Sequence, residues 1–180
     1  TILKERKYVI INFLIIIQGS IMKVSLLKED KIEQIVKYCM RIFEQERAEC
    51  FVSSLNVIQT FQQLTIVRNL FFNNAIKAFG VLNDTTGEIE KIMIVRLADA
   101  IEYTAVIEII ISSLDSEFVG CCINELKDYF EDSYYSKVKI NIIDKELDLY
   151  TEKMLIDNCF NKELEYEIDT GIFRVFTRPL

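Results

Sequence analysis

The sequence TAVIEIII, from Thr104 to Ile111, is the most strongly patterned stretch of the chain. Nearly every residue is apolar and most are β-branched, which is typical of a central strand covered on both faces. Glu108 is the only charge within it. A second strand-like run, Val138–Ile143 (VKINII), follows after a segment with helical periodicity. Because a crossover of helical length joins parallel strands, we expect these two strands to be parallel neighbours in one sheet.

The rest of the chain alternates between strand and helix patterns around this central strand. In chain order, the other expected elements are a strand at Met22–Leu27, a helix from Lys28, a helix at about Ser54–Asn73, a hairpin of Ala75–Leu82 and Ile89–Leu97, helices through Val119–Phe130 and Leu147–Leu155, and a closing hairpin of Leu164–Ile168 and Ile172–Thr177, with Pro179 beyond it. This order predicts an α/β fold: a single domain with a mixed central sheet and helices on both of its faces.

The composition limits the class of protein. The 180 residues suit one domain, and an apolar fraction of 51% is enough for a sizeable core. The net charge of −7 repels phosphate backbones, so no nucleic acid is expected as a partner, whereas amines would be attracted. The chain has no histidine, which excludes histidine bases and the commonest zinc sites, and no metal site is expected. Five scattered cysteines are typical of reduced thiols in a cytoplasmic protein.

Residues 1–21 differ from the rest of the chain. A basic cluster at 4–7 precedes an apolar run, Tyr8–Ile17, of ten residues. A bilayer needs about 20 residues, so this run is too short to span one. The pattern imitates a signal peptide, but the bulky Gln18 stands where cleavage needs a small residue. We therefore interpret 1–21 as an apolar extension and 22–180 as the domain.

The order of elements over Met22–Leu180, together with Gly120 and Phe160 at two motif positions, resembles the GNAT superfamily of acyl-CoA-dependent N-acyltransferases. In that superfamily the central strand ends in a loop Q/R-x-x-G-x-G/A, whose backbone amides hold the CoA pyrophosphate at a helix N-terminus. The matching stretch here is Asp115–Gly120 (DSEFVG). The resemblance implies a V-shaped cleft between the two parallel strands, with acetyl-CoA or another acyl-CoA as co-substrate. The residues that it places against this co-substrate are Ile110, Ile111, Val119, Gly120 and Cys121.

The motifs depart from the superfamily pattern. Asp115 stands at the glutamine or arginine position, Phe118 replaces the first glycine, and Glu117 adds a negative charge. Two carboxylates beside a pyrophosphate weaken binding unless they point away. In the pattern Y-x-K-x-G-F of the next helix, Leu155 takes the place of the tyrosine that protonates the leaving thiolate. Tyr150, more than one turn earlier, is the candidate substitute, and the alternative is a core aromatic residue.

Glu108 is the candidate general base. Acyl transfer to an amine needs a group that removes a proton from nitrogen, and an apolar strand disfavours the charged carboxylate, which suits a base near neutral pH. The alternative is that Glu108 pairs with a lysine or an arginine, or faces solvent. The adjacent Cys121 and Cys122 suggest redox chemistry, but Cys122 lies on the apolar stripe of its helix, so packing accounts for it better.

Three functions remain open. The first is an N-acyltransferase of the N-acetyltransferase type, acting on a small-molecule or peptide amine, as a monomer or a homodimer. The second is a catalytically inactive module of the same fold that binds a protein partner or a small ligand, which the altered motifs favour. The third is a membrane-associated structural subunit anchored by Tyr8–Ile17. We favour the first because the superfamily tolerates variation in its loop.

We predict that residues 1–21 do not cross a membrane, because their apolar run is too short. In fractionated cells, the full chain and a variant without residues 1–21 should both appear in the soluble fraction. Recovery of the full chain in the membrane fraction alone, with release on removal of residues 1–21, would contradict this.

Overall fold

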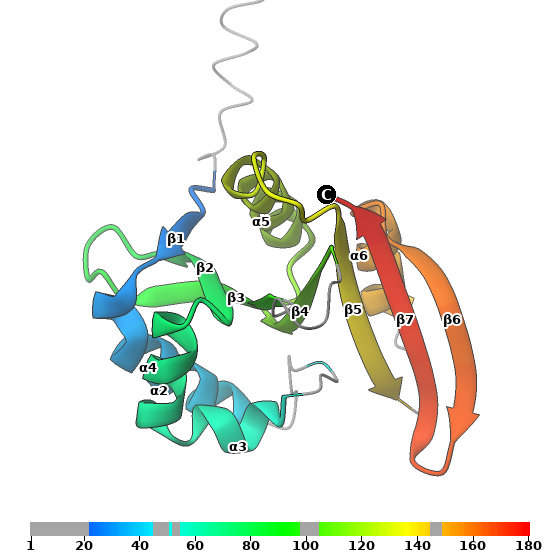
Figure 1. Ribbon diagram of the computed structural model, residues 1–180, viewed down its shortest axis with the longest axis horizontal. Helices are drawn as coiled ribbons and strands as arrows, with labels where there is room; N and C mark the ends of the chain where they lie inside the picture. The colour runs from blue at the N-terminus through cyan, green and yellow to red at the C-terminus, as the bar shows by residue number, and fades with distance from the viewer. Residues whose placement is uncertain (1–21, 45–50, 52–54, 98–104, 145–148) are drawn as a thin grey trace, which may run out of the picture.

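The computed structural model describes residues 22–44, 51, 55–97, 105–144 and 149–180. These residues form a seven-stranded sheet with helices on both sides (Figure 1). The elements are β1 (Ser25–Leu27), the 3-10 turn η1 (Glu29–Lys31), α2 (Ile32–Glu44), α3 (Val57–Phe61), α4 (Leu64–Phe72), β2 (Ile76–Leu82), β3 (Ile89–Leu97), β4 (Val106–Ser112), α5 (Ser116–Tyr129), β5 (Lys137–Asp144), α6 (Leu149–Asp157), β6 (Asn161–Ile168) and β7 (Gly171–Pro179). The α/β class and the mixed sheet are as the sequence predicts.

The sheet has the order β1-β2-β3-β4-β5-β7-β6, and its neighbours are antiparallel except for β4 and β5. Those two are parallel and are joined through α5, which confirms the prediction. Their pairing ends at Ile109↔Ile140, although β4 continues to Ser112 and β5 to Asp144. The two strands therefore separate at their C-terminal ends, as Figure 1 shows. We call this separation the opening.

Alternate residues of the strands face two apolar clusters, one on each side of the sheet. On the α5 face, α5 and α6 pack over side chains such as Val95, Ile109 and Ile140. On the α2 face, α2, α3 and α4 pack over side chains such as Ala78 and Ile94. Among the described residues, no side chain of β5, β6 or β7 belongs to the cluster of the α2 face. Among the described residues, β5 and β7 therefore contribute side chains to the core on the α5 face only, and β6 is exposed along nearly its whole length.

The helix expected at Ser54–Asn73 is divided into α3 and α4. The apolar residues that predicted it recur at every third position, and such a stripe rotates around a straight helix of 3.6 residues per turn. A break at Gln62 and Gln63, where Gln63 is extended, resets this rotation. The buried residues of the two helices are Val57, Thr60, Phe61, Val67 and Phe71.

Three smaller predictions were wrong at strand ends. β6 begins at Asn161 instead of Leu164. The first strand begins at Ser25 instead of Met22, and Pro179 is the last residue of β7, opposite Lys137, instead of lying beyond the strand. A proline is tolerated at a strand end, where its missing N–H costs no ladder bond. No described helix is both long and apolar enough to cross a bilayer. The run Tyr8–Ile17 lies outside the described residues.

Candidate functional site

The opening begins beside an irregularity in β4. Ile94 of β3 pairs with Ile111, whereas the next residue, Val95, pairs with Ile109. Ile110 is therefore an extra residue, a β-bulge, and both Ile110 and Ile111 pack in the cluster of the α2 face. A bulge takes backbone groups out of the sheet ladder, and here it does so where β5 also leaves β4. Ile110 and Ile111, two of the five residues that the resemblance places against an acyl-CoA, thus border the opening.

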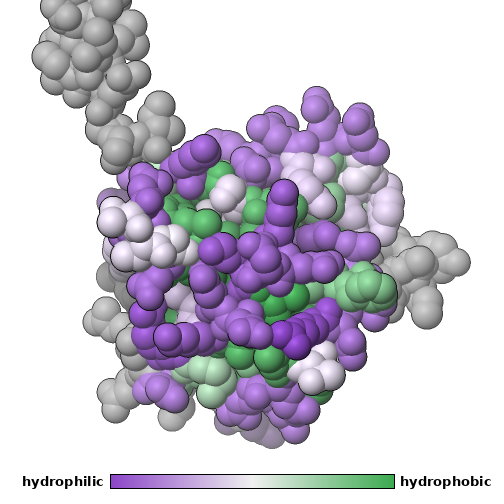
Figure 2. Space-filling model, turned by 90° about the vertical axis from the view of Figure 1, so that its left-hand side faces the viewer, coloured by the Kyte–Doolittle hydropathy of each residue, from purple (hydrophilic) through white to green (hydrophobic). Residues whose placement is uncertain are grey.

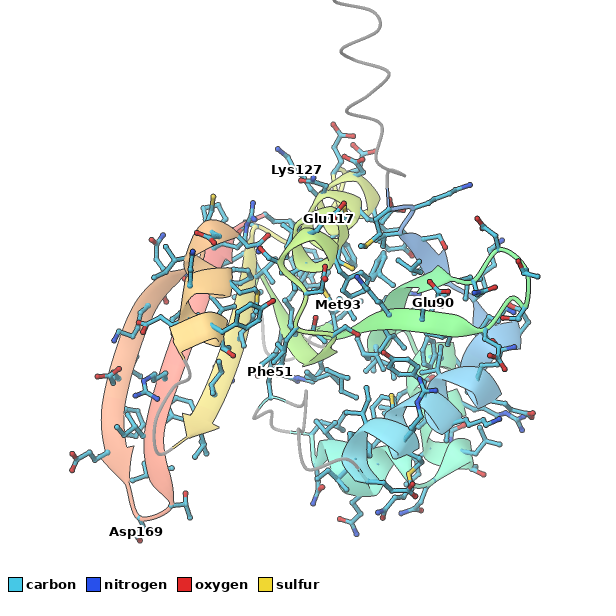
Figure 3. All side chains as sticks on the ribbon, turned by 180° about the vertical axis from the view of Figure 1, so that it is seen from behind. Phe51, Glu90, Met93, Glu117, Lys127 and Asp169 are labelled. Atoms are coloured by element: carbon cyan, nitrogen blue, oxygen red, sulfur yellow. The ribbon has the colours of Figure 1, made fainter. Side chains whose placement is uncertain are left out.

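Phe51, from the segment between α2 and α3, fills part of the opening. Its backbone N–H donates to the carbonyl oxygen of Ile110 over 3.1 Å, one residue beyond the end of the β4–β5 pairing. Phe51 is 8% exposed and belongs to the cluster of the α5 face, although α2 and α3 pack on the α2 face. Because β3 closes the other side of β4, the ring reaches the α5 face through the opening (Figure 3).

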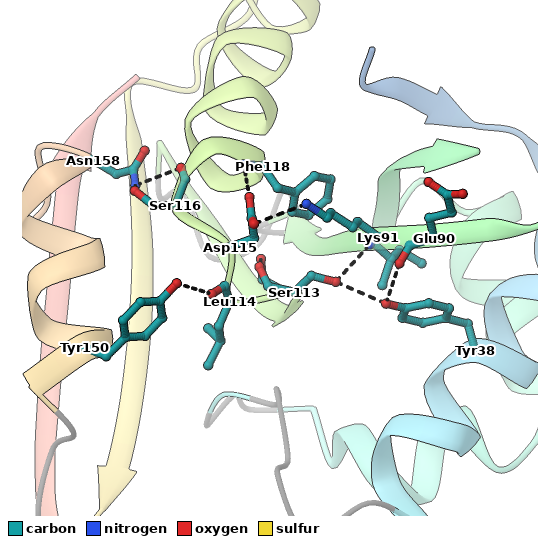
Figure 4. A network of polar contacts seen from close by, with 12 residues as sticks. Tyr38, Glu90, Lys91, Ser113, Leu114, Asp115, Ser116, Phe118, Tyr150 and Asn158 are labelled. Carbon is teal, nitrogen blue, oxygen red and sulfur yellow. Dashed lines mark hydrogen bonds and ion pairs between the residues drawn. The ribbon is translucent and has the colours of Figure 1, made fainter. Parts of the chain in front are cut away.

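Asp115 caps the N-terminus of α5. Its Oδ1 accepts a hydrogen bond from the N–H of Phe118 (2.7 Å), and its Oδ2 lies 3.2 Å from the Lys91 ammonium (Figure 4). The bond from Phe118, with Lys91 beside it, holds the pKa of Asp115 below its ordinary value. The chain's own carboxylate thus lies at the positive end of the helix, where the superfamily loop binds a pyrophosphate, and accepts from one of its free amides.

The three residues that were predicted to hold the pyrophosphate lie too far along α5. A helix leaves only its first N–H groups without a partner, and the N–H of Val119 donates to the carbonyl of Asp115 (2.9 Å). This amide therefore already has a partner within the chain, which does not fit the role that the resemblance implies for Val119. Gly120 and Cys121 come later still, so their amides belong to the internal ladder of a helix that begins at Ser116.

Gly120 serves the contact between α5 and α6. A Cβ at this position would lie 2.9 Å from the Oδ1 of Asn158, closer than packed atoms tolerate. Asn158 is held in place because its Nδ2 donates to the carbonyl and hydroxyl oxygens of Ser116 and to the carbonyl of Met154. Helix packing therefore explains the one glycine that matches the superfamily loop.

The two other altered motif positions belong to the core. Phe118, at the first glycine position, and Leu155, at the tyrosine position, are fully buried in the cluster of the α5 face. Restoring a glycine in place of Phe118 would remove a core ring, and such a loss costs at least about 3–5 kcal/mol. The altered loop is therefore part of the folding core and cannot be reverted without loss of stability.

Tyr150, the candidate proton donor, lies in the first turn of α6. It is 58% exposed, so the alternative of a core aromatic residue does not apply. Its hydroxyl donates to the carbonyl of Leu114 over 3.4 Å (Figure 4). Leu114 connects β4 to α5, so Tyr150 reaches from α6 to the end of β4 at which the opening lies.

Glu108 is 3% exposed and paired. Its Oε2 lies 2.8 Å from Nε of Arg96, and its Oε1 accepts a hydrogen bond from Nδ2 of Asn141 (2.7 Å). The same Oε1 lies 3.6 Å from the Lys139 ammonium. Glu108 was expected to pair with a lysine or an arginine, to face solvent, or to act as a base. The structure shows that it pairs with both Lys139 and Arg96 and does not face solvent. Because its partners lie on β3 and β5, Glu108 ties three strands together immediately before β4 and β5 separate.

The adjacent cysteines are protonated thiols. Burial raises the pKa of both Cys121 and Cys122, so neither is a reactive thiolate. Cys39 is also buried and Cys159 is exposed, whereas Cys50 lies outside the described residues. No group of three or more metal-binding side chains occurs in the described part of the chain.

Three residues of this region were not identified from the sequence. Lys91 and Asn158 act on Asp115 and Ser116, which are far from them in sequence, and no local pattern reveals such contacts. Phe51 is an apolar residue outside every periodic segment. This position outside the predicted helices and strands was the only feature of the sequence that could have drawn attention to Phe51.

Comparison with solved structures identifies the fold. The ribosomal-protein-S5-alanine acetyltransferase from Vibrio fischeri matches with a TM-score of 0.61 at 18% identity, over 87% of this chain and 91% of its own. A GNAT-family acetyltransferase from Streptococcus pneumoniae matches with a TM-score of 0.61 at 11% identity, over 88% and 99%. An aminoglycoside acetyltransferase in complex with coenzyme A matches with a TM-score of 0.52 at 12% identity, over 87% and 94%. The chain therefore has the fold of the GNAT acetyltransferases, as the sequence predicts.

No protein-family model matches the chain, and no curated protein matches it in sequence. At the identities of the solved structures the likeness extends to the fold, so the activity must be argued from the residues of the site.

We expect Gly120→Ala to destabilise the protein by about 1–3 kcal/mol, the usual cost of overpacking, because the new Cβ meets Asn158. In an Asn158→Ala background, where that oxygen is absent, the same substitution should cost much less. Denaturant unfolding of the four proteins gives the coupling free energy between the two sites. Equal costs in both backgrounds would show that Gly120 is not required for packing.

Proposed function

We propose that the protein is an acyl-CoA-dependent N-acyltransferase, which transfers an acyl group to an amine. The observation that carries this proposal is the coincidence of the Ile110 bulge with the separation of β4 from β5. Together they take main-chain groups of a central apolar strand out of the ladder, and buried groups of this kind need another partner. The extended arm of CoA carries amide groups that suit them. Acetyltransferases of the same fold, one with coenzyme A bound, support this choice.

The site has a strand end, where β4 and β5 separate, and a helix end, at the N-terminus of α5. These two ends suit an acyl-CoA unequally. At the strand end, the N–H of Phe51 bonds to the carbonyl of Ile110, as an amide of the CoA arm would after Phe51 withdraws. At the helix end, Asp115 occupies the N-terminus of α5, Glu117 is exposed beside it, and Lys91 is a nearby cation. We therefore propose weak binding, in which the strand contacts contribute more than the contacts to the diphosphate.

Two side chains at the strand end move protons in this proposal. When bound, acyl-CoA would supply the acyl group as a thioester, whose C–S bond breaks as the acceptor nitrogen forms its C–N bond. Glu108 accepts a proton from the acceptor amine, and for this it gives up its longest contact, that of 3.6 Å to Lys139. Tyr150 gives its hydroxyl proton to the leaving sulfur and regains one from solvent, to which it is exposed.

The contacts that Asp115 and Phe51 make without a ligand, which we call the closed state of the site, favour a second function. With Asp115 capping α5 and Phe51 in the opening, the chain satisfies its own groups without a ligand. A catalytically inactive module that binds a protein partner or a small ligand would keep these contacts permanently. The two functions therefore differ in whether Phe51 can leave the opening.

Calorimetric titration with acetyl-CoA is expected to give weak binding to the native chain and binding tighter by about tenfold or more to Phe51→Ala, because the closed state competes with the ligand. Phe71→Ala is the matched control. Phe71 is similarly buried, at 6% against 8%, but it lies on α4 in the cluster of the α2 face. Circular dichroism verifies that both variants fold.

Each outcome of this titration is informative. Absence of binding to both the native chain and Phe51→Ala would exclude the acyltransferase and leave the inactive module. A similar gain in Phe71→Ala would show that loosening of the core, and not release of the opening, improves binding.

Tyr150→Phe should lower kcat by about 10²–10⁴-fold, because it removes the proton donor and keeps the ring, and it should leave acetyl-CoA affinity unchanged. Glu108→Gln should lower kcat similarly, because an amide cannot accept the proton of the acceptor amine. Release of the CoA thiol is measured with a panel of amines. A loss of stability with kcat unchanged in Glu108→Gln would assign Glu108 to structure alone.

A further inference from the structure

Among the described residues, no helix packs over an apolar patch on the outer part of the sheet. On the α2 face of β5, β7 and β6, Ile143, Phe173 and Tyr166 form one row, and Val175 and Leu164 lie in the next. The ring centroids of Tyr166 and Phe173 are 5.1 Å apart. Ile143, Leu164 and Tyr166 are between 36% and 47% exposed. Adjoining exposed apolar side chains of this kind mark a binding surface. We call these five residues the patch.

The patch continues into the pair of Glu108 and Lys139. Along the α2 face of β5, Lys139 is followed by Asn141 and then by Ile143 of the patch. The side chain of Lys139 is 32% exposed, and its ammonium lies 3.6 Å from Glu108, longer than the ~2.7–2.9 Å of a charge-assisted hydrogen bond. Glu108 is held closely by Arg96 and Asn141, and Lys139 is its loosely paired cation where β4 and β5 separate, at the border of an apolar surface.

We propose that the acceptor is an apolar α-amino acid in its zwitterionic form. Its ammonium takes the place of Lys139 beside Glu108, its carboxylate pairs with the Lys139 ammonium, and its side chain lies on the patch. This exchange leaves every charge paired, so it avoids the cost of an isolated charge in a partly buried site. An amine without a carboxylate would leave Lys139 without its anion, and a polycation would be repelled by Lys139 and Arg96.

The size of the patch favours a small molecule over a second copy of the chain. A stable dimer buries about 800 Å² on each partner, more than five side chains that are already partly covered can supply. The side of the molecule next to β1 is, by contrast, mostly hydrophilic, with its apolar residues gathered in smaller groups between polar ones (Figure 2). The patch adjoins the proposed site of acyl transfer, so a side chain lying on it belongs to the acceptor.

The assignment rests on the proposed acyl transfer, but its test needs no acyl-CoA. Calorimetry measures the binding of four probes to the full chain: L-phenylalanine, phenethylamine, which lacks the carboxylate, glycine, which lacks the side chain, and kanamycin, which is a polycation. L-Phenylalanine should bind at least tenfold more tightly than each of the other three.

Two variants separate the parts of the site. Phe173→Asp should weaken L-phenylalanine binding at least tenfold, because it places a charge on the patch. Lys139→Met should remove most of the difference between L-phenylalanine and phenethylamine, because it removes the partner of the carboxylate. Tyr134→Asp is the matched control, since Tyr134 is an aromatic residue with 61% exposure that lies beyond the end of α5, outside the patch. Tyr134→Asp should leave the affinities for all four probes unchanged.

Binding of phenethylamine or kanamycin as tight as that of L-phenylalanine, or unaltered affinity in Phe173→Asp, would overturn the proposal, whatever the acetyl-CoA titration gives. A dimer of the native chain that Phe173→Asp dissociates would assign the patch to a second copy and overturn it as well. Selective binding of L-phenylalanine without any binding of acetyl-CoA would reject the acyl transfer and retain the amino-acid site.

Discussion

The loss of β5 as a neighbour of β4 is the constraint on which the site depends. A buried carbonyl or N–H needs a partner, and β4 loses its regular one after Ile109, in the middle of an apolar sheet. The N–H of Phe51 supplies that partner for Ile110, and its ring fills the space between the strands. The opening is therefore not a void in the free protein. A ligand that enters it must replace an amide donor and an apolar ring together, and the proposed acyl-CoA has an arm with amide groups that suits the first of these.

The same requirement governs the start of α5. Its first amides need acceptors, and Asp115 provides one, a contribution of about 1 kcal/mol for a typical N-cap. Lys91 then balances the charge of that carboxylate. Asn158 fixes the other side of this turn through its bonds to Ser116. Each end of the site is thus stable without a ligand, and an anion at this helix would meet a negative charge where the superfamily offers free amides.

The sequence predicted the parts of the fold that depend on periodicity. The β-branched run around Glu108 predicted the central strand, and the helix-length crossover predicted its parallel neighbour. The break between α3 and α4 could have been inferred from the apolar stripe. Its three-residue spacing does not stay on one face of a straight α-helix, which has 3.6 residues per turn. The role of Gly120 could not be predicted, because it depends on Asn158 of a different helix. Likewise, the alternatives for Glu108 could be separated only by strand register, which brings Arg96 and Lys139 beside it.

The altered loop and the filled opening have different consequences for an enzyme. Contacts to a diphosphate are remote from the reacting carbonyl and are equally strong before and during the reaction, so their loss raises KM and leaves kcat unchanged. The residues proposed to move protons, Glu108 and Tyr150, lie at the strand end and do not depend on the helix N-terminus. Asp115 and Phe118 at the motif positions therefore argue against tight binding, but not against acyl transfer. Phe51 is different, because its backbone and ring occupy the strand end itself. If the proposed function holds, acyl transfer by this chain therefore depends on the free energy of withdrawing Phe51, and not on the missing glycine of the loop.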